Sequence, residues 1–267
     1  MSSGRLIVKQ ALGLNPNVKN CLTFVDDHSL AYVCGHQVVV ANTEVREQAF
    51  IPATNTYQHQ SLGITAIAAC LGKKLIAVAE KVDPTAIVTF YDSKSLRKKK
   101  MLNTPELGSK EIKALVFSDD GKFLLTQGGG PEWNLILWHV EKTAKALCSA
   151  KIALSDENPV HQISFCPWDN SVILVIGKGI LRLFRFVEGQ LRPMTITVRR
   201  DVANFLSHCW LPDESLVVGT ENGDILMIEN FEFRGHISTC RGDEEPFPVL
   251  CLQSAGRGFL MGKLHAT

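Results

Sequence analysis

Short apolar runs recur along the chain, and a polar turn follows each of them. Six of these runs end at comparable positions, which are Phe24, Ala69, Phe117, Phe165, Trp210 and Leu252. Neighbouring positions in this set lie between 42 and 48 residues apart. A step of about 40–45 residues with several short strands per unit is typical of a β-propeller blade. A helical repeat would need a 3.6-residue apolar period over ten or more residues, and no segment shows one.

The unit that starts at Ile112 shows the expected strands most clearly. Its apolar runs predict strands over 112–118, 122–127, 134–140 and 145–152. The Asp120-Gly121 pair fits the tight turn between the first two strands, because glycine adopts positive φ at no steric cost. The same reading predicts blades at approximately 20–52, 64–103, 112–152, 160–198 and 204–239, with a partial blade at 248–261.

The whole chain, 1–267, is therefore predicted to be one all-β propeller domain of WD type, with five blades and a partial sixth. A seven-blade ring at about 45 residues per blade would need roughly 315 residues. We therefore expect an incomplete ring, from a truncated gene model, a short isoform or a partial build. Within it, residues 1–19 are predicted to include a ring-closing strand, 262–267 an irregular tail, and 249–261 an open sheet edge that needs a cover.

Charge and hydropathy narrow the classes of partner. The 28 Lys and Arg residues nearly balance 27 Asp and Glu residues, which argues against a nucleic-acid-binding domain. No run of 18 apolar residues is present, so no membrane span is predicted. The first ten residues lack the apolar core of a secretory signal, and the eight cysteines show no C-x-x-C spacing. These features predict an intracellular protein with buried thiols.

Enzyme chemistry finds little support in the sequence. The Gly128-Gly129-Gly130-Pro131 run lacks the G-K-[ST] ending and the helix of a phosphate-binding loop. The histidines are scattered without metal-ligand spacing, and no G-x-S-x-G nucleophile motif occurs. We therefore expect no catalytic residues, no cofactor and no metal site.

Two kinds of surface feature are candidates for protein contacts. The basic run Arg97, Lys98, Lys99 and Lys100 suits an acidic partner surface, or alternatively forms a solvated outer strand whose lysines discourage edge pairing. Trp133 and Trp168 fall in predicted turns, so we expect them to be exposed anchors. Trp138 and Trp210 fall in strands and are expected to pack between blades. The candidate contact loops are 52–62, 128–133 and 156–158.

The chain resembles the WD-repeat propeller superfamily, although its motifs are degenerate. At the end of the third strand, the Trp-Asp dipeptide survives only in part, as Tyr91-Asp92 in one blade and Trp138-His139 in another. A Gly-His dipeptide occurs late in the chain, at Gly235-His236, away from its usual place before a first strand. We therefore expect the family's Asp-His-Ser-Trp hydrogen-bond network to be missing from most blades and apolar burial to hold them.

A closer resemblance is carried by several segments, which lie at 12–18, 50–52, 84–91, 97–103, 158–165 and 217–220. They are similar to the amino-terminal propeller of the cilia- and flagella-associated, WD-repeat-65-like axonemal proteins. Full-length members of that family carry two propellers and then a long coiled coil. The resemblance implies a non-enzymatic scaffold in the ciliary or flagellar axoneme. Its implied partners are inner dynein arm or regulatory-complex subunits and the doublet microtubule, without nucleic acid or membrane.

Two other readings remain open. One is a cytosolic WD-repeat scaffold of another complex, such as translation initiation or a vesicle coat. The other is an enzyme built on a propeller, which would need carboxylates or histidines converging at the channel mouth. The inner strands offer mostly apolar and small residues, which favours the scaffold.

Overall fold

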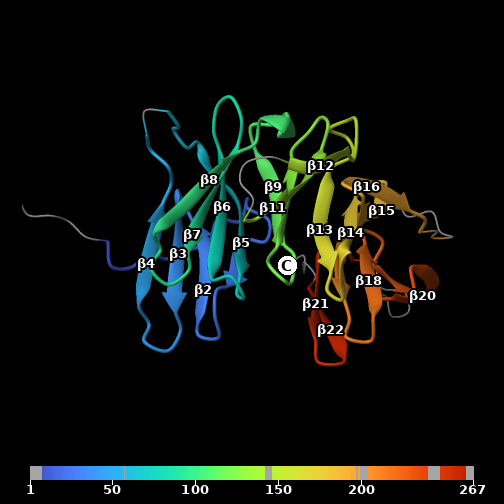
Figure 1. Ribbon diagram of the computed structural model, residues 1–267. Helices are drawn as coiled ribbons and strands as arrows, with labels where there is room; N and C mark the ends of the chain where they lie inside the picture. The colour runs from blue at the N-terminus through green and yellow to red at the C-terminus, as the bar shows by residue number, and fades with distance from the viewer. Residues whose placement is uncertain are drawn as a thin grey trace, which may run out of the picture. The chain divides into compact units, whose positions relative to one another are not determined.

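The computed structural model describes residues 8–56, 58–141, 146–196, 198, 204–239 and 247–262. The chain divides into two compact units. Unit 1 holds residues 1–129 and 135–146, and unit 2 holds residues 130–134 and 147–267. Figure 1 shows strands throughout both units, and the only helix among the described residues is a single 3₁₀ turn at Pro105–Leu107.

Unit 1 begins with two complete four-stranded sheets. The first sheet consists of β1 (Leu22–Phe24), β2 (Ser29–Cys34), β3 (Gln37–Asn42) and β4 (Gln48–Pro52). The second consists of β5 (Gly63–Cys70), β6 (Leu75–Lys81), β7 (Ile87–Asp92) and β8 (Lys98–Asn103). The third sheet contains β9 (Ile112–Phe117), β10 (Phe123–Gly128), β11 (Asn134–His139) and β12 (Ala146–Lys151).

Unit 2 contains two further four-stranded sheets and a two-stranded one. The fourth sheet consists of β13 (Val160–Cys166), β14 (Asp169–Gly177), β15 (Ile180–Val187) and β16 (Gln190–Met194). The fifth consists of β17 (Phe205–Trp210), β18 (Ser215–Thr220), β19 (Asp224–Glu229) and β20 (Glu232–Ser238). The last two strands are β21 (Cys251–Ala255) and β22 (Gly258–Gly262).

In every sheet the strands are neighbours in chain order, as in the meander of a propeller blade. The second, fourth and fifth sheets pair antiparallel throughout. The prediction of an all-β fold with five blades and part of a sixth is confirmed. Of the predicted first segment, residues 1–7 lie outside the described residues, and residues 8–19 form no strand. Of the tail predicted at 262–267, Gly262 is instead the last residue of a strand, and residues 263–267 lie outside the described residues.

Each unit has its own apolar core, built mainly from the two middle strands of each sheet. In β14 the side chains from Val172 to Ile176 are all fully buried. A strand with one solvent-exposed face alternates apolar and polar residues, whereas a strand that is buried on both faces is apolar throughout. Unit 1 shows the same in β7, and Phe90 there meets Phe117 of β9 edge to face at 6.2 Å.

Polar contacts also join neighbouring sheets, which corrects the expectation of packing by apolar burial alone. In unit 2, Ser164 of β13 lies 2.7 Å from Nε2 of His208 on β17. The His208 backbone N–H donates to Oε1 of Gln162 at 2.9 Å, and its carbonyl accepts from Nε2 of Gln162 at 3.1 Å. His208 is only 1% exposed. Since buried polar groups must be paired, this side chain needs β13 in place.

Candidate interaction sites

Lys98, Lys99 and Lys100 of the basic run lie on β8, the outer strand of the second sheet, and Arg97 directly precedes this strand. Arg97, Lys98 and Lys99 are exposed, as the sequence predicted. The Nζ of Lys99 lies 3.0 Å from Oδ2 of Asp92. Hydrogen bonds from Ser95 and this lysine hold the pKa of the Asp92 carboxyl well below its usual range. Lys99 is therefore committed to its own sheet, whereas Arg97 and Lys98 form no ion pair within the described residues.

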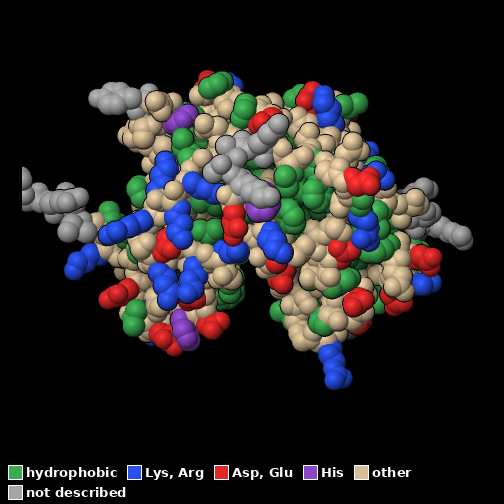
Figure 2. Space-filling model, in the orientation of Figure 1, with side chains coloured by type: hydrophobic (Ala, Val, Ile, Leu, Met, Phe, Trp, Pro, Cys, Tyr) green, Lys and Arg blue, Asp and Glu red, His purple; other side chains and the backbone are tan. Residues whose placement is uncertain are grey.

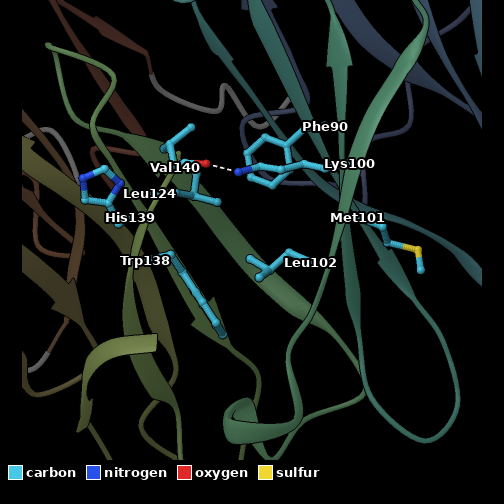
Figure 3. A pocket seen from close by; sticks show the side chains of 8 residues that line it. All are labelled: Phe90, Lys100, Met101, Leu102, Leu124, Trp138, His139 and Val140. Carbon is cyan, nitrogen blue, oxygen red and sulfur yellow. Dashed lines mark hydrogen bonds between the residues drawn. The ribbon is translucent and has the colours of Figure 1, made fainter. Parts of the chain in front are cut away.

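Lys100 behaves differently from the rest of the run. Side chains alternate along a strand, so Lys100 and Leu102 face inward while Met101 points to the other side of β8 (Figure 3). The Lys100 ammonium donates to the carbonyl oxygen of Val140 and lies 4.8 Å from the centre of the Phe90 ring. Burial lowers the pKa of this amine. The interpretation of the run as one exposed basic strand is therefore wrong at Lys100.

A small cavity lies beside this contact, within unit 1. It has a volume of about 50 Å³, and Phe90, Leu102, Leu124 and Trp138 are among the side chains that line it (Figure 3). An ion pair also connects the same two sheets, in which Nζ of Lys73 lies 2.7 Å from Oε1 of Glu141. This cavity thus lies where the second and third sheets pack together, and the Lys100 amine beside it is already hydrogen-bonded to Val140.

Trp133 lies within unit 2 and is 6% exposed, so the prediction that it is exposed is wrong. Its Nε1 donates to the carbonyl of Ser155 at 3.0 Å, and its own carbonyl accepts from Ile152 at 3.3 Å. The neighbouring Gly130 lies against Asp156, where a Cβ would clash. Trp133 is buried because the segment after β12 packs against it, and this packing partner is not visible in the sequence of the turn itself.

Trp168, in the turn between β13 and β14, is 40% exposed, which confirms its predicted exposure. Its ring contacts that of Trp210 at a centroid distance of 5.3 Å and an angle of 85°. The two rings help to line a pocket of about 40 Å³, which we call the Trp168 pocket. Its remaining lining residues are Glu214, Leu216, Ile228, Asn230 and Phe231.

The sequence did not single out Glu214 and Phe231, although a signal was present. Glu214 lies in the turn between β17 and β18, and Phe231 in the turn between β19 and β20. In an antiparallel meander the first and third turns lie at the same end of the sheet. Trp168 occupies the first turn of the preceding sheet, so the repeat itself places these three turns at one end.

Hydrogen bonds hold some residues of the candidate contact loops in place. In the loop 52–62, the N–H and hydroxyl of Thr54 donate to the buried carboxylate of Glu80 at 2.7 and 2.6 Å. In the third, Nδ2 of Asn158 donates to the carbonyl of Lys178 at 3.2 Å, while Glu157 is exposed. Their role in partner contact stays a prediction.

The described cysteines are free thiols, and three of them, Cys70, Cys166 and Cys209, are buried. Burial raises the pKa of Cys148 and of Cys209 to about 11. Cys251 is exposed, which the expectation of buried thiols missed. Within the described ranges, no three His, Cys, Asp or Glu side chains gather as a metal site. No described helix is long and apolar enough to cross a membrane.

Comparison with known proteins agrees with this architecture. The chain is similar to cilia- and flagella-associated protein 57 of Mus musculus, at 33% identity over 237 residues, which cover 87% of this chain and 18% of the mouse protein. It is also similar to cilia- and flagella-associated protein 43 of Chlamydomonas reinhardtii, at 23% identity, over 78% of this chain and 14% of the algal protein. The chain therefore spans less than a fifth of the length of these relatives.

Among solved structures, the chain resembles the β-propeller domain of Myceliophteria thermophila Cps50 (Swd1), with a TM-score of 0.60 and 16% identity. The alignment covers 77% of this chain and 65% of that domain. This likeness establishes the WD-type propeller fold. The family model of the CFAP43 N-terminal domain matches residues 11–260, nearly the whole chain. The chain belongs to this CFAP43 N-terminal domain family, among the WD-repeat propellers of cilia- and flagella-associated proteins.

Proposed function

We propose that this chain is a non-enzymatic interaction scaffold of the ciliary or flagellar axoneme, which helps to dock or regulate inner dynein arms on doublet microtubules. The family match over residues 11–260 carries the proposal, together with relatives named as cilia- and flagella-associated proteins. Its partners would be inner dynein arm or regulatory-complex subunits.

The structure supports a scaffold by the way its turns are held. The middle strands of each sheet are buried, so the turns between strands project from a rigid support. Binding residues are often carried on loops that a rigid scaffold positions. A partner would be held by several dispersed turns rather than by one deep cleft.

The outer edge of the second sheet is the proposed contact for an acidic partner. Arg97 and Lys98 are exposed there and lack an ion pair among the described residues. On the face in Figure 2, several blue Lys and Arg side chains lie over the sheets of unit 1, with red acidic ones between them. Such exposed charges attract an oppositely charged surface over about one Debye length, ~8 Å at physiological salt.

Cross-linking in isolated axonemes tests this proposal. The tagged chain is expressed in multiciliated cells, axonemes are demembranated, and its cross-linked peptides are identified by mass spectrometry. We expect cross-links to inner dynein arm or regulatory-complex subunits, fewer of them for the Arg97→Glu, Lys98→Glu variant, and no change for Lys151→Glu. Absence from axonemes, with cross-links to translation-initiation or coat proteins instead, would overturn the proposal.

A further inference from the structure

We infer that the Trp168 pocket binds the ammonium group of a lysine side chain on a partner protein, and that methylation of this ammonium strengthens binding. The inference rests on the proposed role of the chain as an interaction scaffold and names the chemistry that one of its surfaces recognises. All lining residues belong to unit 2.

The aromatic walls supply the first part of the argument. Trp168 and Trp210 stand nearly perpendicular, at 85°, and the half-buried ring of Phe231 lines the pocket with them. The face of an aromatic ring carries partial negative charge, which attracts cations within about 6 Å of the ring centre. Several aromatic rings around one pocket are the usual means by which proteins hold a methylated ammonium.

A carboxylate supplies the second part. Glu214 is exposed at the pocket, and its side chain makes no hydrogen bond or ion pair within the described part of the chain. The adjacent Asp213 differs, because its carboxylate accepts 2.6 and 3.1 Å hydrogen bonds from the hydroxyl and N–H of Ser215. Glu214 therefore offers the uncommitted negative charge that a cation would meet at this pocket.

The remaining lining favours methyl groups over N–H groups. Leu216 and Ile228 are almost fully buried and provide no hydrogen-bond acceptor on their side chains. An unmodified ammonium carries three donors, which need acceptors when water is removed. Methylation keeps the charge and replaces donors with apolar contact. The pocket volume of about 40 Å³ also exceeds the 10–15 Å³ that one water molecule needs.

The backbone of the pocket is held in an unfavourable conformation. Glu214, Asn230 and Phe231 have φ values of 64°, 51° and 63°. The two-residue turn between β19 and β20 places Asn230 and Phe231 at positions where Asn-Gly is strongly preferred. Phenylalanine at the second of these positions weakens the turn, yet it places an aromatic ring in the pocket wall. Residues with this backbone conformation occur in ligand clamps, and in this chain they also occupy other turns, such as those at Arg46, Lys74 and Leu96.

Peptide binding tests the inference. The probes are Gly-Gly-Lys-Gly-Gly amides whose lysine is unmodified, trimethylated or acetylated, titrated into the ¹⁵N-labelled chain. The indole signal of Trp168 is assigned with the Trp168→Phe variant. We expect this signal to shift, with a Kd for the trimethylated peptide about tenfold or more below that for the acetylated one and the unmodified peptide between them. The inference is overturned by equal affinity for the acetylated peptide, by tighter binding of the unmodified peptide, or by no shift at all.

Substitution of Glu214 tests whether the pocket recognises the charge of the lysine as well as its shape. Glu214→Gln should raise the Kd of both cationic peptides about two- to fivefold, the range for an exposed ion pair, and leave the acetylated peptide unchanged. Glu188→Gln, which changes an exposed carboxylate of the same unit that does not line the pocket, is the matched control and should change neither. An unchanged Kd in Glu214→Gln would contradict recognition of the ammonium charge by Glu214. Axonemal cross-links without any lysine-peptide binding would end this inference and leave the proposed function standing.

Discussion

The indole Nε1 of Trp210 donates a 2.8 Å hydrogen bond to the hydroxyl of Ser164, which lies 46 residues earlier in the chain. The same hydroxyl lies 2.7 Å from Nε2 of His208. One serine of β13 thus satisfies two polar side chains of β17. This arrangement retains the serine, histidine and tryptophan types of the WD-repeat network, but it joins two sheets instead of closing within one.

Removal of the Ser164 hydroxyl should therefore destabilise unit 2. Ser164→Ala leaves the Trp210 and His208 nitrogens without this partner, and an unsatisfied buried polar group costs about 1–3 kcal/mol. We expect the free energy of unfolding, measured by chemical denaturation, to fall by about this amount. Ser93→Ala, which removes a hydroxyl with no hydrogen bond among the described residues, should change it by less than about 0.5 kcal/mol. Equal stability of the two variants would show that the contact contributes little.

Lys100 should act on stability rather than on partner binding. Lys100→Met keeps a long apolar stem beside Phe90 but removes the hydrogen bond to the carbonyl of Val140. Such a bond contributes about 1 kcal/mol, and the penalty that burial places on the charged amine offsets part of it. We expect a loss of up to about 1 kcal/mol for Lys100→Met and no measurable loss for the exposed Lys98→Met. Thermal and denaturant unfolding of both variants measure the difference, and equal values would contradict it.

The sequence predicted the sheets well because their signal is local. Apolar runs and turn residues recur with the blade period, and in the unit that starts at Ile112 the observed strands begin and end within one residue of the predicted ones. The inward position of Lys100 was also readable, since it shares strand parity with Leu102. The basic composition of the run obscured this alternation.

The errors concern contacts between distant segments. The sequence predicts an exposed Trp133 because a turn is usually exposed, whereas its burial depends on residues 152–156. The sequence does not predict the Ser164–His208–Trp210 contact, because His208 and Trp210 lie 44 and 46 residues after Ser164 and on a different strand. A pattern within one blade does not reveal such pairs, because they depend on how neighbouring sheets pack.

The two tryptophans that lie in turns should differ in accessibility to solvent. Acrylamide quenches exposed indoles far more efficiently than buried ones, and Trp168 is 40% exposed against 6% for Trp133. We expect Trp168→Phe to remove most of the readily quenched fluorescence of the chain. Trp133→Phe should leave the quenching constant of the remaining fluorescence almost unchanged while lowering stability, because Ser155 loses its donor. A strong fall in quenching for Trp133→Phe would contradict the buried position.

The cysteines give a pH-dependent prediction with a defined sign. Burial raises the pKa of Cys209 from 9.0 in the unfolded chain to about 11 in the folded protein. The folded state therefore keeps a proton that the unfolded state loses between pH 9 and 11, so this thiol contributes stability that is present below pH 9 and lost as the pH rises toward 11. Denaturation between pH 8 and 11 should show a smaller decline for Cys209→Ala than for the unchanged chain. The exposed Cys251 provides the control, and Cys251→Ala should retain the full decline.

Alkylation with iodoacetamide at pH 8, mapped by mass spectrometry, should label Cys251 first and Cys209 last, because only a thiolate reacts and burial keeps Cys209 protonated. Faster labelling of Cys209 than of Cys251 would contradict the protonated, buried state of that thiol.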